Sequence, residues 1–97
     1  MERQPCVYIT TNKRNGTLYV GVTSSILHRA WQHRNGLIPG FTKKYGLRRL
    51  VYLEFLESFP EAIRREKQLK NWRRVWKIKL IESKNPEWKD LFPLLVD

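Results

Sequence analysis

The sequence has a single cysteine, Cys6, which excludes an internal disulfide and a cysteine-based zinc site. One thiol is typical of a reducing compartment, so we expect a cytoplasmic protein. No apolar run approaches the roughly 18 residues that a membrane-spanning helix needs, and we expect no membrane partner. The first five residues lead into a short apolar run instead of a signal-peptide core.

Acidic residues are also scarce, because nine Asp and Glu stand against nineteen Lys and Arg, for a net charge of +10. The chain is nevertheless 41% hydrophobic, which excludes a disordered polycation. Residues 12–49 hold eight basic residues and no acid, and residues 64–79 hold eight basic residues and one acid. Such an imbalance favours a polyanionic partner, and nucleic acid is the commonest one in a cell. Two basic walls of a phosphate-binding surface are predicted, and a solvated helix face beside a basic loop is the alternative.

The 97 residues allow one small domain, for which we expect residues 1–97, and its first part is predicted to be a β-hairpin. Two β-branched and aromatic runs, residues 6–10 and 18–22, flank an Asn15-Gly16 turn signal. Alternation along each strand places Tyr8 and Tyr19 on one face, and the aliphatic side chains on the other. Gly21 lies beside Tyr19, and a missing side chain there often marks a close approach by another group.

Helices and one more strand account for the remaining chain. We expect a helix from residue 26 with an apolar stripe, a long basic loop over residues 35–49 and a buried strand over residues 50–57. A helix after the Ser58 cap reaches about residue 72, a further helix covers about 73–83, and a short last helix follows Pro86. The predicted fold class is α/β (α+β), with a small three-stranded antiparallel sheet flanked by helices.

Glu66 is the single acid of the second basic block, and helical geometry places it in the middle of the face formed by Ala62, Ile63 and Leu69, which should be buried. A buried carboxylate is costly unless it is paired or binds a metal. An ion pair with a neighbouring cation is one interpretation. The other is a ligand for Mg²⁺ (or Mn²⁺), which often takes only one or two protein carboxylates and further oxygens from substrate phosphate.

Other candidate catalytic residues are Arg29, His33, Tyr8 and Tyr19. Arg29 and His33 are four residues apart on one helix flank, where a guanidinium binds phosphate oxygens and an imidazole transfers protons. A lone histidine is more often an ordinary surface residue. The two tyrosines, each a common strand residue, together become candidates for positioning or deprotonating a water molecule.

These residues resemble the GIY-YIG nuclease signature. Cys6-Val7-Tyr8 and Tyr19-Val20-Gly21 correspond to the two tripeptides, and Arg29, His33 and Glu66 continue the match in order over about residues 5–90. The chain is similar to small standalone members related to the N-terminal catalytic domain of an excinuclease. Cys6 replaces the first glycine of the signature, which we expect to be harmless, and no asparagine is assigned to the position after the metal-binding glutamate.

The resemblance implies a metal-dependent endonuclease that hydrolyses DNA phosphodiester bonds, in DNA repair or recombination. It implies one divalent ion on Glu66, Tyr19 as general base or water-orienting group, and Tyr8 in support. Arg29 would hold the scissile phosphate, and His33 would assist. No additional DNA-binding domain is evident in the sequence, so the resemblance leaves the target open, and no obligatory protein partner is evident either.

We expect seven basic residues to contact nucleic acid: Lys13, Arg14, Lys43, Lys44, Arg48, Arg65 and Lys70. A nuclease fold that binds nucleic acid without cutting it is the alternative function, with Phe41, Tyr45 and the tryptophans as stacking groups, although most tryptophans are expected in the core. A third interpretation is a protein-binding adaptor that uses the aromatic C-terminal residues, Trp88 among them.

Overall fold

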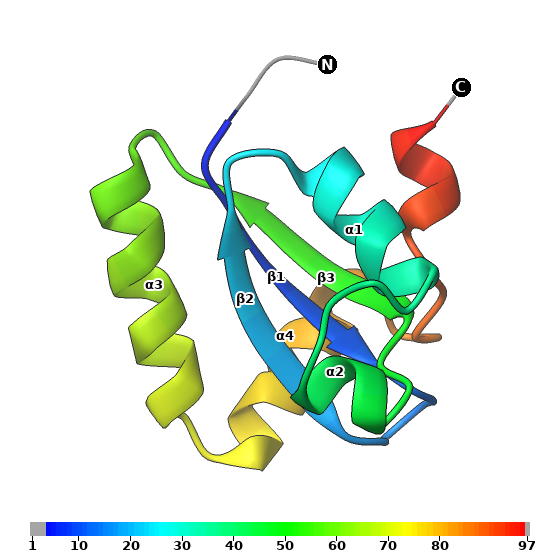
Figure 1. Ribbon diagram of the computed structural model, residues 1–97. Coiled ribbons are helices and arrows are strands. Elements are labelled where there is room, and N and C mark those ends of the chain that lie inside the picture. Colours follow the sequence, from blue (N-terminus) through cyan, green and yellow to red (C-terminus); the bar gives the residue numbers. More distant parts are fainter. Residues whose placement is uncertain (1–3, 97) are drawn as a thin grey trace.

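The computed structural model describes residues 4–96 and arranges a small sheet between helices (Figure 1). In chain order the elements are β1 (Cys6–Thr11), β2 (Leu18–Thr23), α1 (Ile26–Arg34), α2 (Phe41–Lys44), β3 (Arg49–Phe55), α3 (Phe59–Asn71), α4 (Arg74–Lys84) and a 3₁₀ helix, η1 (Phe92–Leu95). The predicted fold class is confirmed.

The three strands form one antiparallel sheet in the order β2-β1-β3, so β2 is an edge strand. The predicted hairpin is present, and its register pairs Tyr8 with Gly21 and Ile9 with Val20. Because side chains alternate along a strand, Val20 and Ile9 share the face opposite to Tyr8. The hairpin register therefore fixes which side chains reach each helical layer.

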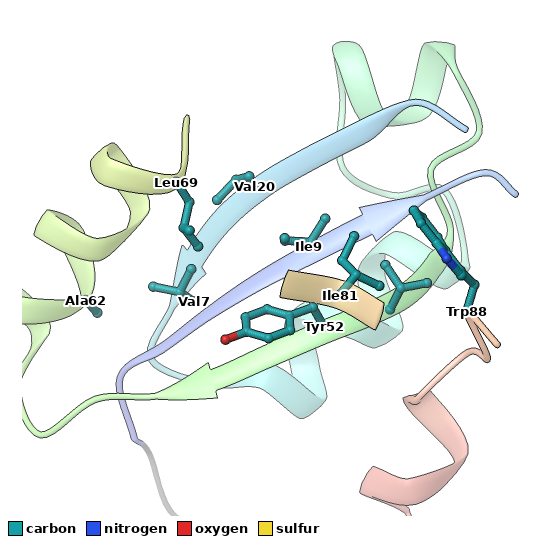
Figure 2. Close-up of a cluster of buried hydrophobic side chains, with 9 residues drawn as sticks. Val7, Ile9, Val20, Tyr52, Ala62, Leu69, Ile81 and Trp88 are labelled. Carbon is teal, nitrogen blue, oxygen red and sulfur yellow. The ribbon is translucent and has the colours of Figure 1, made fainter. Parts of the chain in front are cut away.

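One face of the sheet packs on α3 and α4 (Figure 2). Val7 and Val20 from the strands meet Ala62 and Leu69 of α3, while Ile81 of α4 lies further along the same cluster. The opposite face packs against α1 and η1, and Figure 1 shows α1 and α2 in front of the sheet with α4 behind it. The sheet is thus covered on both faces, with α3 running alongside β2.

α3 begins where its sequence predicts. The Ser58 hydroxyl accepts a hydrogen bond from the backbone N–H of Glu61 at 3.3 Å, and a proline lies in the first turn. Ala62 and Leu69 are fully buried, so this face of the helix is directed at the sheet. Glu66 lies between them in the sequence, and its side chain is 16% exposed.

Three local expectations are wrong. The loop over residues 35–49 contains a helical turn, α2, and the last helix after Pro86 is replaced by irregular chain followed by η1. Trp88 has a positive φ of 58°, a conformation that no α-helix contains, and its buried indole donates to Glu82 Oε2 at 2.7 Å. Trp31 and Trp76 are each 47% exposed, whereas Trp88 is buried and Trp72 packs against the core, so only two of the four tryptophans belong to the core, not most of them.

The burial of Trp88 also removes the main anchor of a C-terminal adaptor surface, although Leu94 is 80% exposed. No described helix has the length and hydropathy of a transmembrane span.

Leu69→Ala should lower the free energy of unfolding by about 2–5 kcal/mol, because the truncation leaves a cavity between α3 and the sheet. Urea denaturation followed by circular dichroism measures this loss. Leu94→Ala removes the same atoms from an exposed position and should change the stability by less than about 0.5 kcal/mol. Equal losses in the two variants would contradict the packing described for α3.

Candidate active site

The candidate site is built around Tyr8, whose side chain lies across the neighbouring strand. A Cβ atom at Gly21 would come within 2.4 Å of the Tyr8 phenol carbon and oxygen, so only glycine leaves room for the ring. Tyr8 is 1% exposed, and its hydroxyl is 2.9 Å from Nε2 of His33. The expected open hairpin face is therefore closed over Tyr8, because α1 packs on it.

His33 is buried, in contrast to the surface position that is most common for a lone histidine. It is 2% exposed on the inner side of α1. Burial, together with the smaller effect of the positive charge of Arg29, lowers the pKa of His33 from 6.5 to about 4. His33 is consequently neutral at pH 7.

The pKa of Tyr8 is raised above its ordinary value, mainly by burial, while Arg29 opposes the shift. Tyr8 therefore stays protonated at neutral pH. The protonated phenol and Nε2 of the neutral imidazole share one hydrogen bond in the closed part of the site.

Tyr19 completes an aromatic cluster with these two residues. Its ring centre is 6.3 Å from that of Tyr8 and 5.8 Å from that of His33. Unlike Tyr8, Tyr19 is only half-buried. Arg29, one turn before His33, is also half-buried. The hairpin and α1 thus bring four of the predicted residues together, and of the two tyrosines only Tyr19 is partly exposed.

Glu66 approaches this cluster from α3 through Lys70. The Lys70 ammonium is 3.4 Å from Oε2 of Glu66 and 6.0 Å from the centre of the Tyr19 ring. β2 is an edge strand, so side chains of α3 can pass beside it toward Tyr19 on the opposite face. The ion pair expected as one alternative is present, but Lys70 is 49% exposed and remains free to exchange partners.

The donor set around Glu66 fits a hard cation only if the substrate supplies further oxygens. Within residues 4–96, no three His, Cys, Asp or Glu side chains gather as a ready-made metal site. A lone, partly exposed carboxylate is nevertheless what Mg²⁺ uses when phosphate and water complete its shell. Glu66 is thus compatible with an ion shared with substrate.

The predicted nucleic-acid contacts do not all lie on one free surface. Exposed positions are occupied by Lys13 and Arg14 in the β1–β2 loop, Lys43 and Lys44 in α2, and Arg48 before β3. Arg65 differs, because its guanidinium is 3.1 Å from Glu54 of β3 and lies 5.3 Å from the centre of the Trp72 ring. This pairing neutralises Arg65 and ties α3 to the sheet.

A hollow of about 250 Å³ beside Tyr19 was not anticipated from the sequence. Its lining brings Phe41 of α2 and Lys77 of α4 next to Tyr19 and Lys70. The one available signal was the spacing of Phe41 and Tyr45, two aromatic residues four apart in a basic segment. Lys77 could not be found, because its sequence position is ordinary among the many cations of α4.

Neither Asn85 nor Cys6 contributes to the aromatic cluster around Tyr8. Asn85 holds the irregular segment after α4, where its amide donates to the carbonyls of Val51 and Lys89. Cys6 is fully buried under α1, and burial raises the pKa of its thiol to about 11. The cysteine at the first position of the signature is thus an inert core residue.

Comparison with known proteins identifies this arrangement. The model of the GIY-YIG catalytic domain matches residues 4–79, which includes both tyrosines, Arg29, His33 and Glu66. The chain belongs to the GIY-YIG family.

GIY-YIG proteins of the UPF0213 group are its relatives. A UPF0213 protein of Clostridium perfringens is 39% identical over 79 residues, which cover 81% of this chain and 84% of the relative. One from Staphylococcus saprophyticus is 37% identical over 79% of this chain and 93% of the relative. A UPF0213 protein of Bacillus halodurans, solved by solution NMR, is 28% identical with a TM-score of 0.56, covering 97% and 99% of the two chains. GIY-YIG membership indicates a nuclease family, while the UPF0213 names specify no activity.

The buried His33 predicts a pH-dependent stability. The unfolded chain binds a proton at its ordinary pKa of 6.5, whereas the folded chain binds it only near 4. The contribution is therefore complete above about pH 6.5 and is lost as the pH falls from 6.5 to the folded pKa near 4, by about 3 kcal/mol in all.

Urea denaturation at several pH values between 7 and 4 measures the slope of the free energy of unfolding against pH. His33→Gln should flatten it, while His28→Gln, at an exposed position of the same helix, should leave it as in the wild type. The His33 ring signals in NMR should titrate well below pH 6. Titration near 6.5 would show that the ring is not buried.

Proposed function

We propose that this GIY-YIG protein is a metal-dependent endonuclease that hydrolyses phosphodiester bonds in DNA. The observation that supports this most is the convergence of Tyr8, Tyr19 and His33 beside Arg29, with the Glu66 carboxylate one lysine away from Tyr19. A cluster of phenols, imidazole, guanidinium and carboxylate contains the groups that a hydrolytic phosphoryl transfer requires. A place in DNA repair or recombination belongs to the same proposal.

The two tyrosines have different tasks in this mechanism. Tyr19 is the water-orienting group or general base: as a neutral phenol it orients the attacking water by a hydrogen bond, and as a phenolate it would also take up the proton of that water. Tyr8 remains protonated, so it acts through its hydrogen bond to His33 and holds the aromatic cluster in place. His33 is neutral at pH 7, and it assists by holding the Tyr8 hydroxyl through the bond at Nε2.

Charge on the phosphate is stabilised from two sides. Arg29 extends from α1 and binds the non-bridging oxygens, for which its planar guanidinium is suited. Glu66 would hold the divalent ion, and a bound Mg²⁺ supplies Lewis-acid stabilisation of the developing negative charge. Lys70 leaves Glu66 for the phosphate backbone when substrate binds, because the ammonium cannot share the carboxylate with a divalent ion at low cost.

A DNA-binding module without cleavage is the second candidate function. The Lys70–Glu66 ion pair favours it, because that pair already satisfies the carboxylate without a metal. The two functions share their basic surface and differ only in whether Glu66 takes part in chemistry.

Glu66→Gln should reduce cleavage of DNA by about 100-fold or more in Mg²⁺ or Mn²⁺, while DNA binding changes little. The amide keeps the size of the side chain and removes the negative charge that binds the ion. Gel analysis of linear, branched and single-stranded DNA, with a parallel binding titration, measures both properties.

Glu61→Gln is the matched control, since Glu61 lies on the same helix in an exposed position and its variant should still cleave DNA. Chelation of divalent ions should abolish cleavage by the wild type. Wild-type turnover in Glu66→Gln or in excess chelator would overturn the nuclease proposal, and binding without any cleavage would establish the second candidate.

The free cations of α2 should determine how strongly DNA binding depends on salt. Lys43→Gln and Lys44→Gln should each reduce the slope of log affinity against log salt by about 1, because each lysine releases a counterion when it contacts phosphate. Binding titrations at several salt concentrations measure the slope. Lys89→Gln, at an exposed lysine that pairs with Glu87, is the control and should not change it.

A further inference from the structure

The hollow beside Tyr19 opens between four elements. Its wall is formed by Leu18, Tyr19 and Val20 of β2, by Phe41 of α2, by Lys70 of α3 and by Lys77 of α4. Because it contains Tyr19, anything bound there is adjacent to the bond that the proposed nuclease would cut. Its volume of about 250 Å³ is below the range for drug-sized ligands, and suits a group no larger than one nucleobase.

An exposed aromatic pair borders this hollow. Phe41 is 48% exposed and Tyr45 is 47% exposed, and their ring centres are 4.8 Å apart. The Lys44 ammonium lies 5.4 Å from the centre of the Tyr45 ring. Exposed rings interleaved with cations are the usual surface on which proteins stack the bases of single strands.

The charges at the hollow complement a phosphate backbone. Among residues 4–96, no ion pair involves Lys43, Lys44 or Lys77, and Lys70 pairs only with Glu66. Burial lowers the pKa of Lys77, and Arg74 acts in the same direction, so an anion that approaches Lys77 relieves an unfavourable charge. An aromatic floor with unpaired cations around it matches a nucleotide better than an apolar protein side chain.

Duplex DNA cannot use such a surface, because the faces of its bases are covered by their neighbours in the stack. Only an unpaired base presents a free face to an aromatic ring. We propose that Phe41, Tyr45 and the hollow beside Tyr19 hold an unpaired nucleotide next to the scissile bond, so that the substrate is DNA with a single-stranded branch and not continuous duplex. This inference rests on the proposed function and specifies its substrate class.

The test uses the wild-type protein in excess chelator, so that no DNA is cut. The probe is a duplex with a single-stranded flap whose first unpaired nucleotide is 2-aminopurine, compared with the same labelled strand in a continuous duplex. We expect about tenfold tighter binding of the flap, with quenching of the 2-aminopurine fluorescence by ring stacking.

Phe41→Leu and Tyr45→Leu should each weaken flap binding by about 5- to 10-fold and leave duplex binding unchanged, because leucine keeps the apolar bulk and removes the ring. Both positions are half exposed, so the fold should survive, as circular dichroism will show. Trp31→Leu is the matched control, since Trp31 is 47% exposed on α1 and lines a different hollow.

Equal affinity for flap and duplex, or unaltered flap binding in both Phe41→Leu and Tyr45→Leu, would overturn this inference. Glu66-dependent cleavage that persists in those cases would leave the nuclease proposal intact. Conversely, a flap preference that depends on the aromatic pair, in a protein that never cuts, would support the subsite and reject the nuclease.

Discussion

The phenol of Tyr8 occupies the space that a side chain at position 21 would need, and the candidate site depends on this single steric constraint. With glycine in β2, the ring crosses its neighbouring strand and reaches Nε2 of His33 at 2.9 Å. Nδ1 of His33 has no hydrogen-bond partner among residues 4–96, so the lost hydration of the ring is only partly replaced. A neutral imidazole held against a protonated phenol is the consequence, and Tyr19 packs against both.

The edge position of β2 brings the two helical layers into one site. α1 covers the tyrosine face of the sheet, whereas α3 packs on the opposite face through Ala62 and Leu69. In the interior of a wider sheet, residues of these layers would be separated by the strands. At an edge strand, Lys70 reaches past β2 toward Tyr19 and links it to Glu66.

Net charge and available charge differ in this protein. The excess of cations indicates a polyanionic partner, but pairing within the fold decides which of them can bind it. Arg65 is held by Glu54, and Arg34 is bound to Asp90, whereas the lysines of α2 project freely. Within the part of the chain that the structure describes, the unpaired Lys77 lines the hollow beside Tyr19 together with Phe41, which forms an exposed pair with Tyr45. Positive charge and aromatic rings for base stacking therefore occur on the same surface.

Features that obey local rules could be predicted from the order of the residues: the two-residue alternation that puts Tyr8 and Tyr19 on one face, the Ser58 cap, and the inward placement of Glu66 on its helix. The burial of His33, the neutralisation of Arg65 and the position of Phe41 at a hollow with Lys77 emerged only from the folded chain. The difference lies in separation along the chain. Strand alternation and helix caps depend on neighbours in sequence, whereas burial and pairing join residues such as Tyr8 and His33, 25 positions apart, that meet only when the sheet and helices pack.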